Sequence, residues 1–240
     1  MIGTLLNVAG ILIGGAVGLS RGKPLTPATE SFFKVTLGAF TVFYGLRLTW
    51  VSLDGPWLQI LKQLLIAVLA LMLGKLAGRL LRLQRMSNRL GQSARGRIAA
   101  ANPNHPPSVS EGFKTCAALF CAAPLGILGA LQDGISGYFY PLAVKAFIDG
   151  LAAMGFVALF GWGAVLAALP VLAFQGTLTL ICAEWLQPFL KAHGLVDSVN
   201  AAGGLLVFSV ALVILGLKKV ALADYFPGLA FAPLLTWVLR

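Results

Sequence analysis

Four runs without any charged residue are the most constraining feature of this chain. They cover residues 1–20, 115–132, 150–183 and 198–217. Each run is close to, or longer than, the roughly 20 mostly apolar residues that a helix needs to cross a bilayer. We therefore expect an all-α fold, a polytopic membrane helical bundle.

The overall composition supports a membrane environment. Hydrophobic residues make up 58% of the 240 positions and charged residues only 11%. A soluble domain usually carries about 45–50% apolar and roughly 25% charged residues. A chain with so few charges has too little polar surface to cover its exterior in water, which excludes an ordinary soluble domain.

The apolar stretches and the breaks between them predict seven spans and one uncertain segment. The final stretch, residues 225–239, is apolar but contains two prolines and is short for a straight crossing, so we expect a short or re-entrant segment. The seven predicted spans cover residues 2–19, 32–53, 57–83, 111–130, 141–160, 164–186 and 198–217.

The net charge of +10 is concentrated in one stretch. Residues 75–97 hold seven of the eighteen basic residues and no acidic residue. Basic residues beside an apolar span are retained on the cytoplasmic side, so we expect residues 84–110 to form a basic cytoplasmic loop and the N-terminus to lie outside. This loop divides residues 1–83 from residues 111–240 within a single transmembrane domain, residues 1–240.

The basic stretch also limits the expected partners. It is suited to anionic lipid headgroups. We expect no nucleic-acid partner, because no aromatic stacking residues alternate with the arginines. The three cysteines lie in apolar segments with no zinc or redox spacing, and the two histidines lie far apart. We therefore expect no metal, no cofactor and no enzymatic activity.

Three glycines in the first span suggest close helix packing. Gly10, Gly14 and Gly18 recur every four residues and so share one helix face. Small residues at this spacing let two helix backbones approach closely in lipid. The partner is either another helix of the same chain or a second copy in a homo-oligomer such as a dimer.

Charged residues within the apolar part of the chain are the candidates for function. Placing such a group near the middle of the bilayer costs roughly 2.5–3.5 kcal/mol on insertion scales. Lys145 and Asp149 are four positions apart, so they can meet on one helix face. They form either an internal ion pair that fixes packing or part of a hydrated path.

The segment that precedes them offers a second group of candidates. Gln132 and Asp133 are followed by glycines and a proline, which predicts either irregular backbone at membrane depth or an ordinary external loop. Asn7 and Gln175 lie inside predicted spans. Their amides either form hydrogen bonds between helices or line a path.

The residues in these segments resemble one known family. The stretches GTLLNVAGILIGGAVG, FCAAPLGILGALQDGISG, LAVKAFIDG, FQGTLTL and NAAGGLLVFSVALVILGLKK occur in the same order as in the DUF554 family of bacterial multi-spanning inner-membrane proteins. The resemblance implies the inner (cytoplasmic) membrane and a transporter role. One position departs from the family pattern: an acidic residue often follows the second glycine of the third span, where this chain has Gly78-Arg79.

The sequence therefore predicts a membrane transporter or channel for a small ion or polar solute. The alternative is a non-transporting membrane scaffold or partner subunit that acts through the basic loop. The residues expected along the path are Asn7, Gln132, Asp133, Lys145, Asp149 and Gln175.

Overall fold

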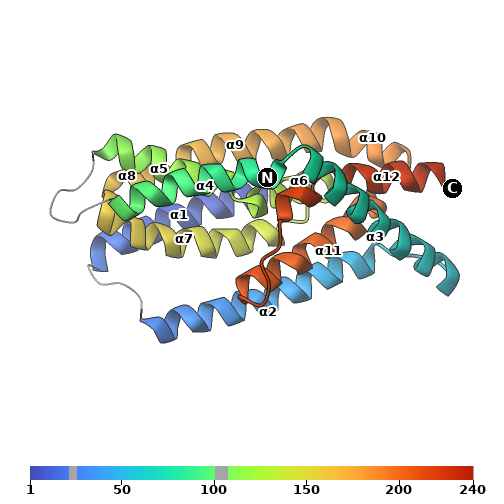
Figure 1. The fold of residues 1–240 in the computed structure, drawn as a ribbon, viewed down its shortest axis with the longest axis horizontal. Coiled ribbons are helices and arrows are strands. Elements are labelled where there is room, and N and C mark those ends of the chain that lie inside the picture. Colours follow the sequence, from blue (N-terminus) through green and yellow to red (C-terminus); the bar gives the residue numbers. More distant parts are fainter. Residues whose placement is uncertain (22–25, 101–107, 240) are drawn as a thin grey trace. The chain divides into compact units, whose positions relative to one another are not determined.

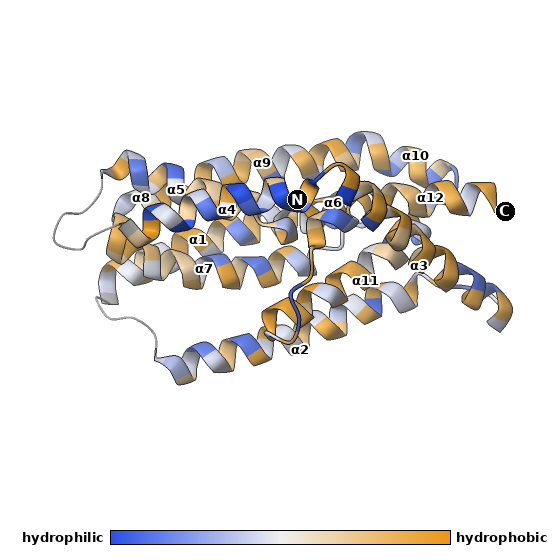
Figure 2. Cartoon of the chain, in the orientation of Figure 1, coloured by the Kyte–Doolittle hydropathy of each residue, from blue (hydrophilic) through white to orange (hydrophobic). Residues whose placement is uncertain are grey.

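The computed structural model describes residues 1–21, 26–100 and 108–239. Throughout these residues the regular secondary structure is helical and contains no strand (Figure 1). Apolar residues cover most of the long helices other than the helix at Leu83–Ala100, which is mainly hydrophilic (Figure 2). The all-α architecture expected from the uncharged runs is confirmed.

Within the described residues, five helices are long and apolar enough to cross a membrane, or up to six if one bent helix pair is counted as a span. The sequence predicted seven spans, and that number stays a prediction. The predicted span at residues 32–53 is not among these helices, because Lys34 and Arg47 lower the mean hydropathy of the corresponding helix α2 (Pro27–Val51). The five single spans are Ile2–Ser20, Trp57–Leu80, Tyr140–Phe160, Trp162–Ala192 and Val196–Ile214.

The chain forms two compact units, each built from segments on both sides of the basic stretch. Unit 1 contains residues 1–30, 87–133 and 137–180, and unit 2 contains residues 31–86, 134–136 and 181–240. One boundary between the units falls inside the basic stretch, between Met86 and Ser87, but the other boundaries lie elsewhere in the chain.

Unit 1 is built around a close contact between α1 (Ile2–Arg21) and α7 (Tyr140–Phe160). Gly10, Gly14 and Gly18 face the backbones of Ala146, Gly150 and Met154, in that order. The matching order shows that the two helices run parallel. A side chain on any of the three glycines would overlap the α7 backbone, so the absence of a Cβ is what permits this approach.

The predicted span at residues 111–130 is two helices, and this corrects the sequence interpretation. Helix α5 (Val109–Ala122) ends where Ala123 adopts an extended conformation, and α6 (Pro124–Ser136) starts at the proline with a bend of 58°. A proline disfavours helical geometry in the residue before it, which breaks the helix at Ala123. The irregular backbone expected around and after Asp133 is confined to residues 137–139, because α6 continues through Asp133 to Ser136 and is capped by Gly137 in the left-handed conformation.

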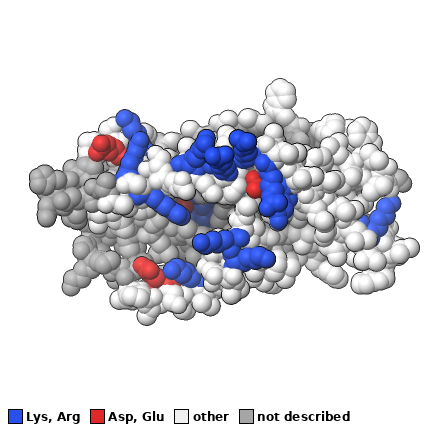
Figure 3. Space-filling model, viewed as in Figure 1, with Lys and Arg blue, Asp and Glu red and all other residues white. Residues whose placement is uncertain are grey.

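The basic stretch expected to be a loop is helical over α4 (Leu83–Ala100). Its leucine, glutamine, arginine and alanine residues favour a helix, and Ala94 is buried while Ile98 packs against the apolar core of unit 1. Basic side chains gather on the face of the molecule over α4 (Figure 3). The rest of the predicted loop includes residues 101–107, which lie outside the described residues.

Unit 2 contains two antiparallel helix contacts. On α2, Gly45 faces Gly204 and Phe208 of α11 (Val196–Ile214), and the Thr49 hydroxyl donates to the Ala201 carbonyl at 3.2 Å. These contacts hold the second predicted span against the seventh.

The second contact of unit 2 shows how the C-terminal segment lies. On α3 (Trp57–Leu80), Gly78 faces Asp224 of the short helix η2 (Leu222–Tyr225), and Gly74 faces Gly228 at the start of α12 (Gly228–Val238). At the other end the Lys62 ammonium donates to the Leu239 carbonyl at 2.6 Å. Sixteen residues of α3 separate Lys62 from Gly78, which corresponds to about 24 Å of helix. The C-terminal segment therefore runs antiparallel along α3.

Candidate functional site

A group of buried polar side chains lies inside unit 1, where α1, α7 and α9 (Ala168–Ile181) meet. It consists of Asn7, Lys145, Asp149 and Gln175, and we call it the polar cluster. Its members are between 0% and 5% exposed. Polar groups buried to this extent are costly unless they are paired, so their contacts decide what they can do.

Lys145 and Asp149 form an ion pair within α7. They are one helical turn apart, and the i,i+4 spacing brings their side chains together on one face. The whole Lys145 residue is 1% exposed, and among the described residues it is the largest fully buried side chain. The pairing offsets part of the desolvation cost that either charge would carry alone.

A hydrogen bond between two side-chain amides links α1 to α9. The Asn7 amide nitrogen donates to the Gln175 side-chain oxygen at 3.1 Å. Asn7 also lies close enough to the Asp149 carboxylate to interact with it. Asn7 therefore connects the ion pair on α7 with the amide on α9, and the four residues form one connected group.

Gly126 on α6 makes room for two members of the polar cluster. A Cβ at this position would lie 2.8 Å from Lys145 Cε and 2.9 Å from Gln175 Nε2. The α6 backbone therefore closes over the cluster. Any residue larger than glycine would fit at position 126 only if the Lys145 and Gln175 side chains shifted.

Two atoms of the polar cluster are buried and have no hydrogen-bond partner among the described residues. They are the Asn7 side-chain oxygen, an acceptor, and the Gln175 side-chain nitrogen, a donor. A buried group of this kind costs about 1–3 kcal/mol when it stays unpaired. The cluster therefore offers both an acceptor and a donor to a small polar molecule or ion.

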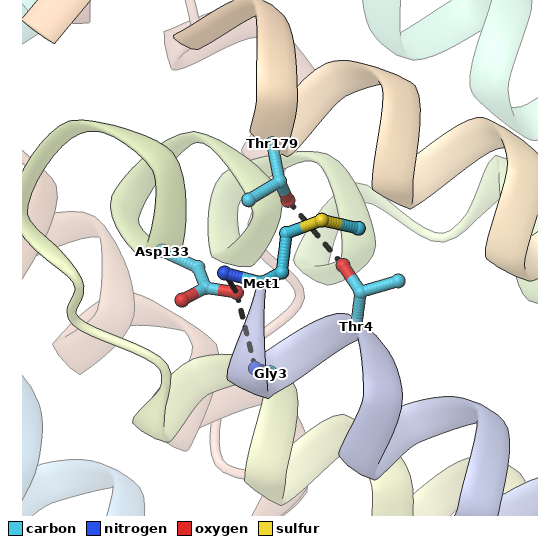
Figure 4. A network of polar contacts seen from close by, with 5 residues as sticks. All are labelled: Met1, Gly3, Thr4, Asp133 and Thr179. Carbon is cyan, nitrogen blue, oxygen red and sulfur yellow. Dashed lines mark hydrogen bonds and ion pairs between the residues drawn. The ribbon is translucent and has the colours of Figure 1, made fainter. Parts of the chain in front are cut away.

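Asp133 lies in a different group, at the start of α1 (Figure 4). Its carboxylate accepts a hydrogen bond from the Gly3 backbone N–H at 3.0 Å and pairs with the Met1 ammonium at 3.2 Å. A carboxylate at a helix N-terminus is favoured by the helix dipole and by the unpaired N–H groups there. Asp133 therefore holds the first turn of α1.

Two threonines, one on α1 and one on α9, lie between Asp133 and the polar cluster. The Thr4 and Thr179 hydroxyls are 3.3 Å apart (Figure 4). Thr4 precedes Asn7 by three positions, and Thr179 follows Gln175 by four. Polar groups thus follow the α1–α9 contact for two turns, from the Thr4–Thr179 pair to the Asn7–Gln175 pair.

The structure brings together four of the six residues predicted to line a path. Asp133 binds the start of α1 instead, and Gln132 is fully buried beside it on α6. Thr4 and Gly126 were not among the predicted residues. Thr4 and Asn7 are three positions apart and so share one helix face, a spacing from which Thr4 could have been predicted as part of the site. No sequence pattern distinguishes Gly126 from the other glycines of this chain.

Beyond the polar cluster, most of the buried interior of unit 1 is apolar, with the buried Thr115 hydroxyl as an exception. Ile11 lies one turn after Asn7 on α1, and Ala153 lies one turn after Asp149 on α7. Both are 0% exposed and belong to a hydrophobic core that also contains Cys116, Phe120 and Val157. The polar groups of unit 1 therefore end at a packed apolar core.

Within the described residues, no group of three histidine, cysteine or acidic side chains is arranged to hold a metal ion. The polar side chains that gather in unit 1 are amides, hydroxyls, the Lys145–Asp149 ion pair and the Asp133 carboxylate.

Apolar helices around buried polar side chains define a helical membrane protein. The sequence profile of the family described as "Protein of unknown function (DUF554)" matches residues 2–237, and the chain belongs to this family. This confirms the resemblance drawn from the sequence motifs.

Two relatives match almost the whole chain. "Uncharacterized membrane protein YdfK" of Bacillus subtilis (strain 168) is 25% identical over 240 residues, which cover 100% of this chain and 97% of the relative. "Uncharacterized protein YqgA" of Escherichia coli (strain K12) is 28% identical over 234 residues, which cover 97% of this chain and 94% of the relative. No solved structure matches the chain.

Proposed function

We propose that this protein is a membrane transporter or channel for a small ion or polar solute, and that the polar cluster of unit 1 is its binding site. The observation that carries the proposal is the connected group of Asn7, Lys145, Asp149 and Gln175, buried inside apolar helices with one acceptor and one donor unused. Intramembrane ionisable residues are costly to keep and usually mark a path for ions or solutes.

Either charge of the Lys145–Asp149 ion pair could exchange its present partner for a bound ion. A bound cation would contact Asp149, and a bound anion would contact Lys145, each replacing part of the existing pair. The Asn7 oxygen and the Gln175 nitrogen would then complete the contacts to the bound species. Because the site contains one negative and one positive group, it suits a small ion or a zwitterionic solute.

The apolar core next to the cluster would act as the closed side of the path. Transport would require this core to open, and the break between α5 and α6 at Ala123 is the point at which α6 can tilt without disrupting helical hydrogen bonds. α1 and α7, which touch through their backbones, would move together as one rigid pair.

Flux measurements in proteoliposomes test the proposal. Asp149→Asn should reduce the flux of the transported solute at least tenfold. The matched control is Glu184→Gln, which removes one carboxylate from an exposed position outside unit 1. Protein-containing and empty vesicles that show the same flux over a broad panel of ions and solutes would refute a transport function.

Several finer features belong to the same proposal. We place the protein in the bacterial inner (cytoplasmic) membrane with seven spans, an external N-terminus and no enzymatic activity. Reporter fusions on either side of each predicted span would test the topology. A homo-oligomer is compatible with this arrangement.

A second function is favoured by α4. Its exposed side carries Arg85 and Arg89 next to Met86 and Leu90, which are 60% and 53% exposed. A basic helix with exposed apolar side chains suits anionic headgroups or a partner protein, as a non-transporting scaffold would require. Arg85→Gln with Arg89→Gln would abolish the function of a scaffold and leave transport largely intact.

A further inference from the structure

Unit 2 contains a groove of about 960 Å³ that no part of the proposed transport site uses. Its walls come from the first half of α3, the turn before α3, the start of α11 and the end of α12. The apolar wall residues on α3 are Leu58, Leu61, Leu65, Ile66, Ala67 and Leu69. We call it the unit 2 groove.

Two carboxylates line this groove and lie close enough to interact with each other. They belong to Asp54 in the turn and Asp197 in the first turn of α11. Asp54 accepts a hydrogen bond from the Gly55 N–H at 2.8 Å. Asp197 has no hydrogen-bond or ion-pair partner among the residues that the structure describes. Neither acid forms an ion pair with a described residue, although the chain has a net charge of +10.

One basic residue, Lys62, also lines the groove. Its ammonium donates to the Leu239 carbonyl at the end of α12, which leaves two of its three N–H donors available. The groove thus presents two acidic groups and one basic group beside an apolar wall.

Aromatic residues place the polar part of the groove at the level of the lipid headgroups. Trp50, Trp57 and Trp237 flank the turn, the start of α3 and the end of α12, and they are between 59% and 74% exposed. Exposed tryptophans at helix ends favour the membrane–water interface. The apolar wall on α3 therefore extends from the interface toward the hydrocarbon.

We propose that the unit 2 groove binds a membrane phospholipid whose headgroup carries both a phosphate and an ammonium group. The ammonium group contacts Asp197 and Asp54, the phosphate contacts Lys62, and an acyl chain lies along Leu58, Leu61 and Leu65. The charges of a zwitterionic headgroup complement those of the groove, whereas a purely anionic headgroup would face two uncompensated carboxylates. The inference is independent of the proposed transport function.

Native mass spectrometry of the purified protein tests this site. The protein is mixed with phosphatidylethanolamine and phosphatidylglycerol of identical acyl chains at equal concentration. Wild-type protein should retain the ethanolamine lipid over the glycerol lipid. Asp197→Asn should reduce this preference by about two- to fivefold, the range expected for one exposed charge pair. Asparagine also suits the first turn of a helix, so the fold of α11 is preserved.

The control and the second variant separate this site from general lipid association. Glu184→Gln removes a carboxylate from the same unit but lies outside the groove, so it should leave the preference unchanged. Leu61→Gln should weaken the retention of both lipids, because it places a polar group on the apolar wall. Equal retention of the two lipids by wild-type protein would overturn the proposal. An Asp197→Asn variant that keeps the wild-type lipid preference would overturn it as well.

Discussion

Asn7 and Gln175 lie 168 positions apart in the chain and share a hydrogen bond of 3.1 Å in the buried interior of unit 1. This bond fixes the facing sides of α1 and α9, and through the contact of Asn7 with Asp149 it connects both helices to the ion pair on α7. The polar cluster is therefore a structural link among three helices as well as a candidate binding site.

The two charges of the ion pair should stabilise the fold only as a pair. Lys145→Met leaves the Asp149 carboxylate buried without its partner and should lower the free energy of unfolding by about 3–5 kcal/mol. Lys145→Met with Asp149→Leu replaces both charges by apolar groups and should recover most of this loss. Thermal unfolding in detergent measures both variants.

The double variant also separates folding from function. If the cluster is the transport site, the double variant should fold like the wild type and still lose solute flux. A double variant with wild-type flux would show that the pair serves packing alone.

The close approach of α1 and α7 should be sensitive to the smallest added side chain. Gly14→Ala places a Cβ in the backbone of Gly150, so the helices must separate and the protein should lose stability. Gly155→Ala, also on α7, is the matched control because nothing lies within 4 Å of its added Cβ. It should stabilise the helix by about 1 kcal/mol. Unfolding curves of the two variants should therefore shift in opposite directions.

The hydrogen bond from Gly3 to Asp133 should protect the first turn of α1. Asp133→Ala removes the acceptor and should speed hydrogen exchange at the Gly3 amide by about 10- to 150-fold, as expected for the loss of a bond worth about 1.5–3 kcal/mol. Asp133→Asn keeps an acceptor oxygen and should have an intermediate effect. Unchanged exchange in both variants would contradict the role of Asp133 as an anchor for α1.

Asp224 should stabilise the start of α4. Its carboxylate accepts a hydrogen bond from the Gln84 backbone N–H at 2.9 Å, and the Gln84 side-chain oxygen accepts one from the Ala223 N–H at 3.0 Å. Asp224→Ala should cost about 1 kcal/mol, the usual effect of losing a helix cap. Asp224→Asn should be nearly neutral. Circular dichroism during thermal unfolding measures the difference between the two variants.

The sequence predicted the contacts that depend on spacing within a single helix. Lys145 and Asp149 meet because they are four residues apart on one helix, and the glycines of α1 share one face for the same reason. The pairing of Asn7 with Gln175 was not predictable in this way. Helical periodicity shows which face of a helix is polar, but it does not show which helix lies opposite.

Two errors in the sequence interpretation have specific physical causes. Asp133 was expected in irregular backbone or a loop because glycines and a proline follow it, yet α6 tolerates Gly134 and ends only at Gly137. The basic stretch was expected to be a loop because its positive charge was interpreted only as evidence that it lies on the cytoplasmic side of the membrane. Its residues also have good helix propensity, and Ala94 and Ile98 give α4 an apolar side.

The apolar packing that begins at Ile11 and Ala153 has an electrical consequence for unit 1. If unit 1 provides the proposed path, ions that reached Lys145 and Asp149 would meet a packed apolar barrier one helical turn further on, so this conformation should conduct no current. A bilayer containing many copies of the protein at rest should keep its voltage, and depolarisation would accompany only the conformations in which that barrier is broken.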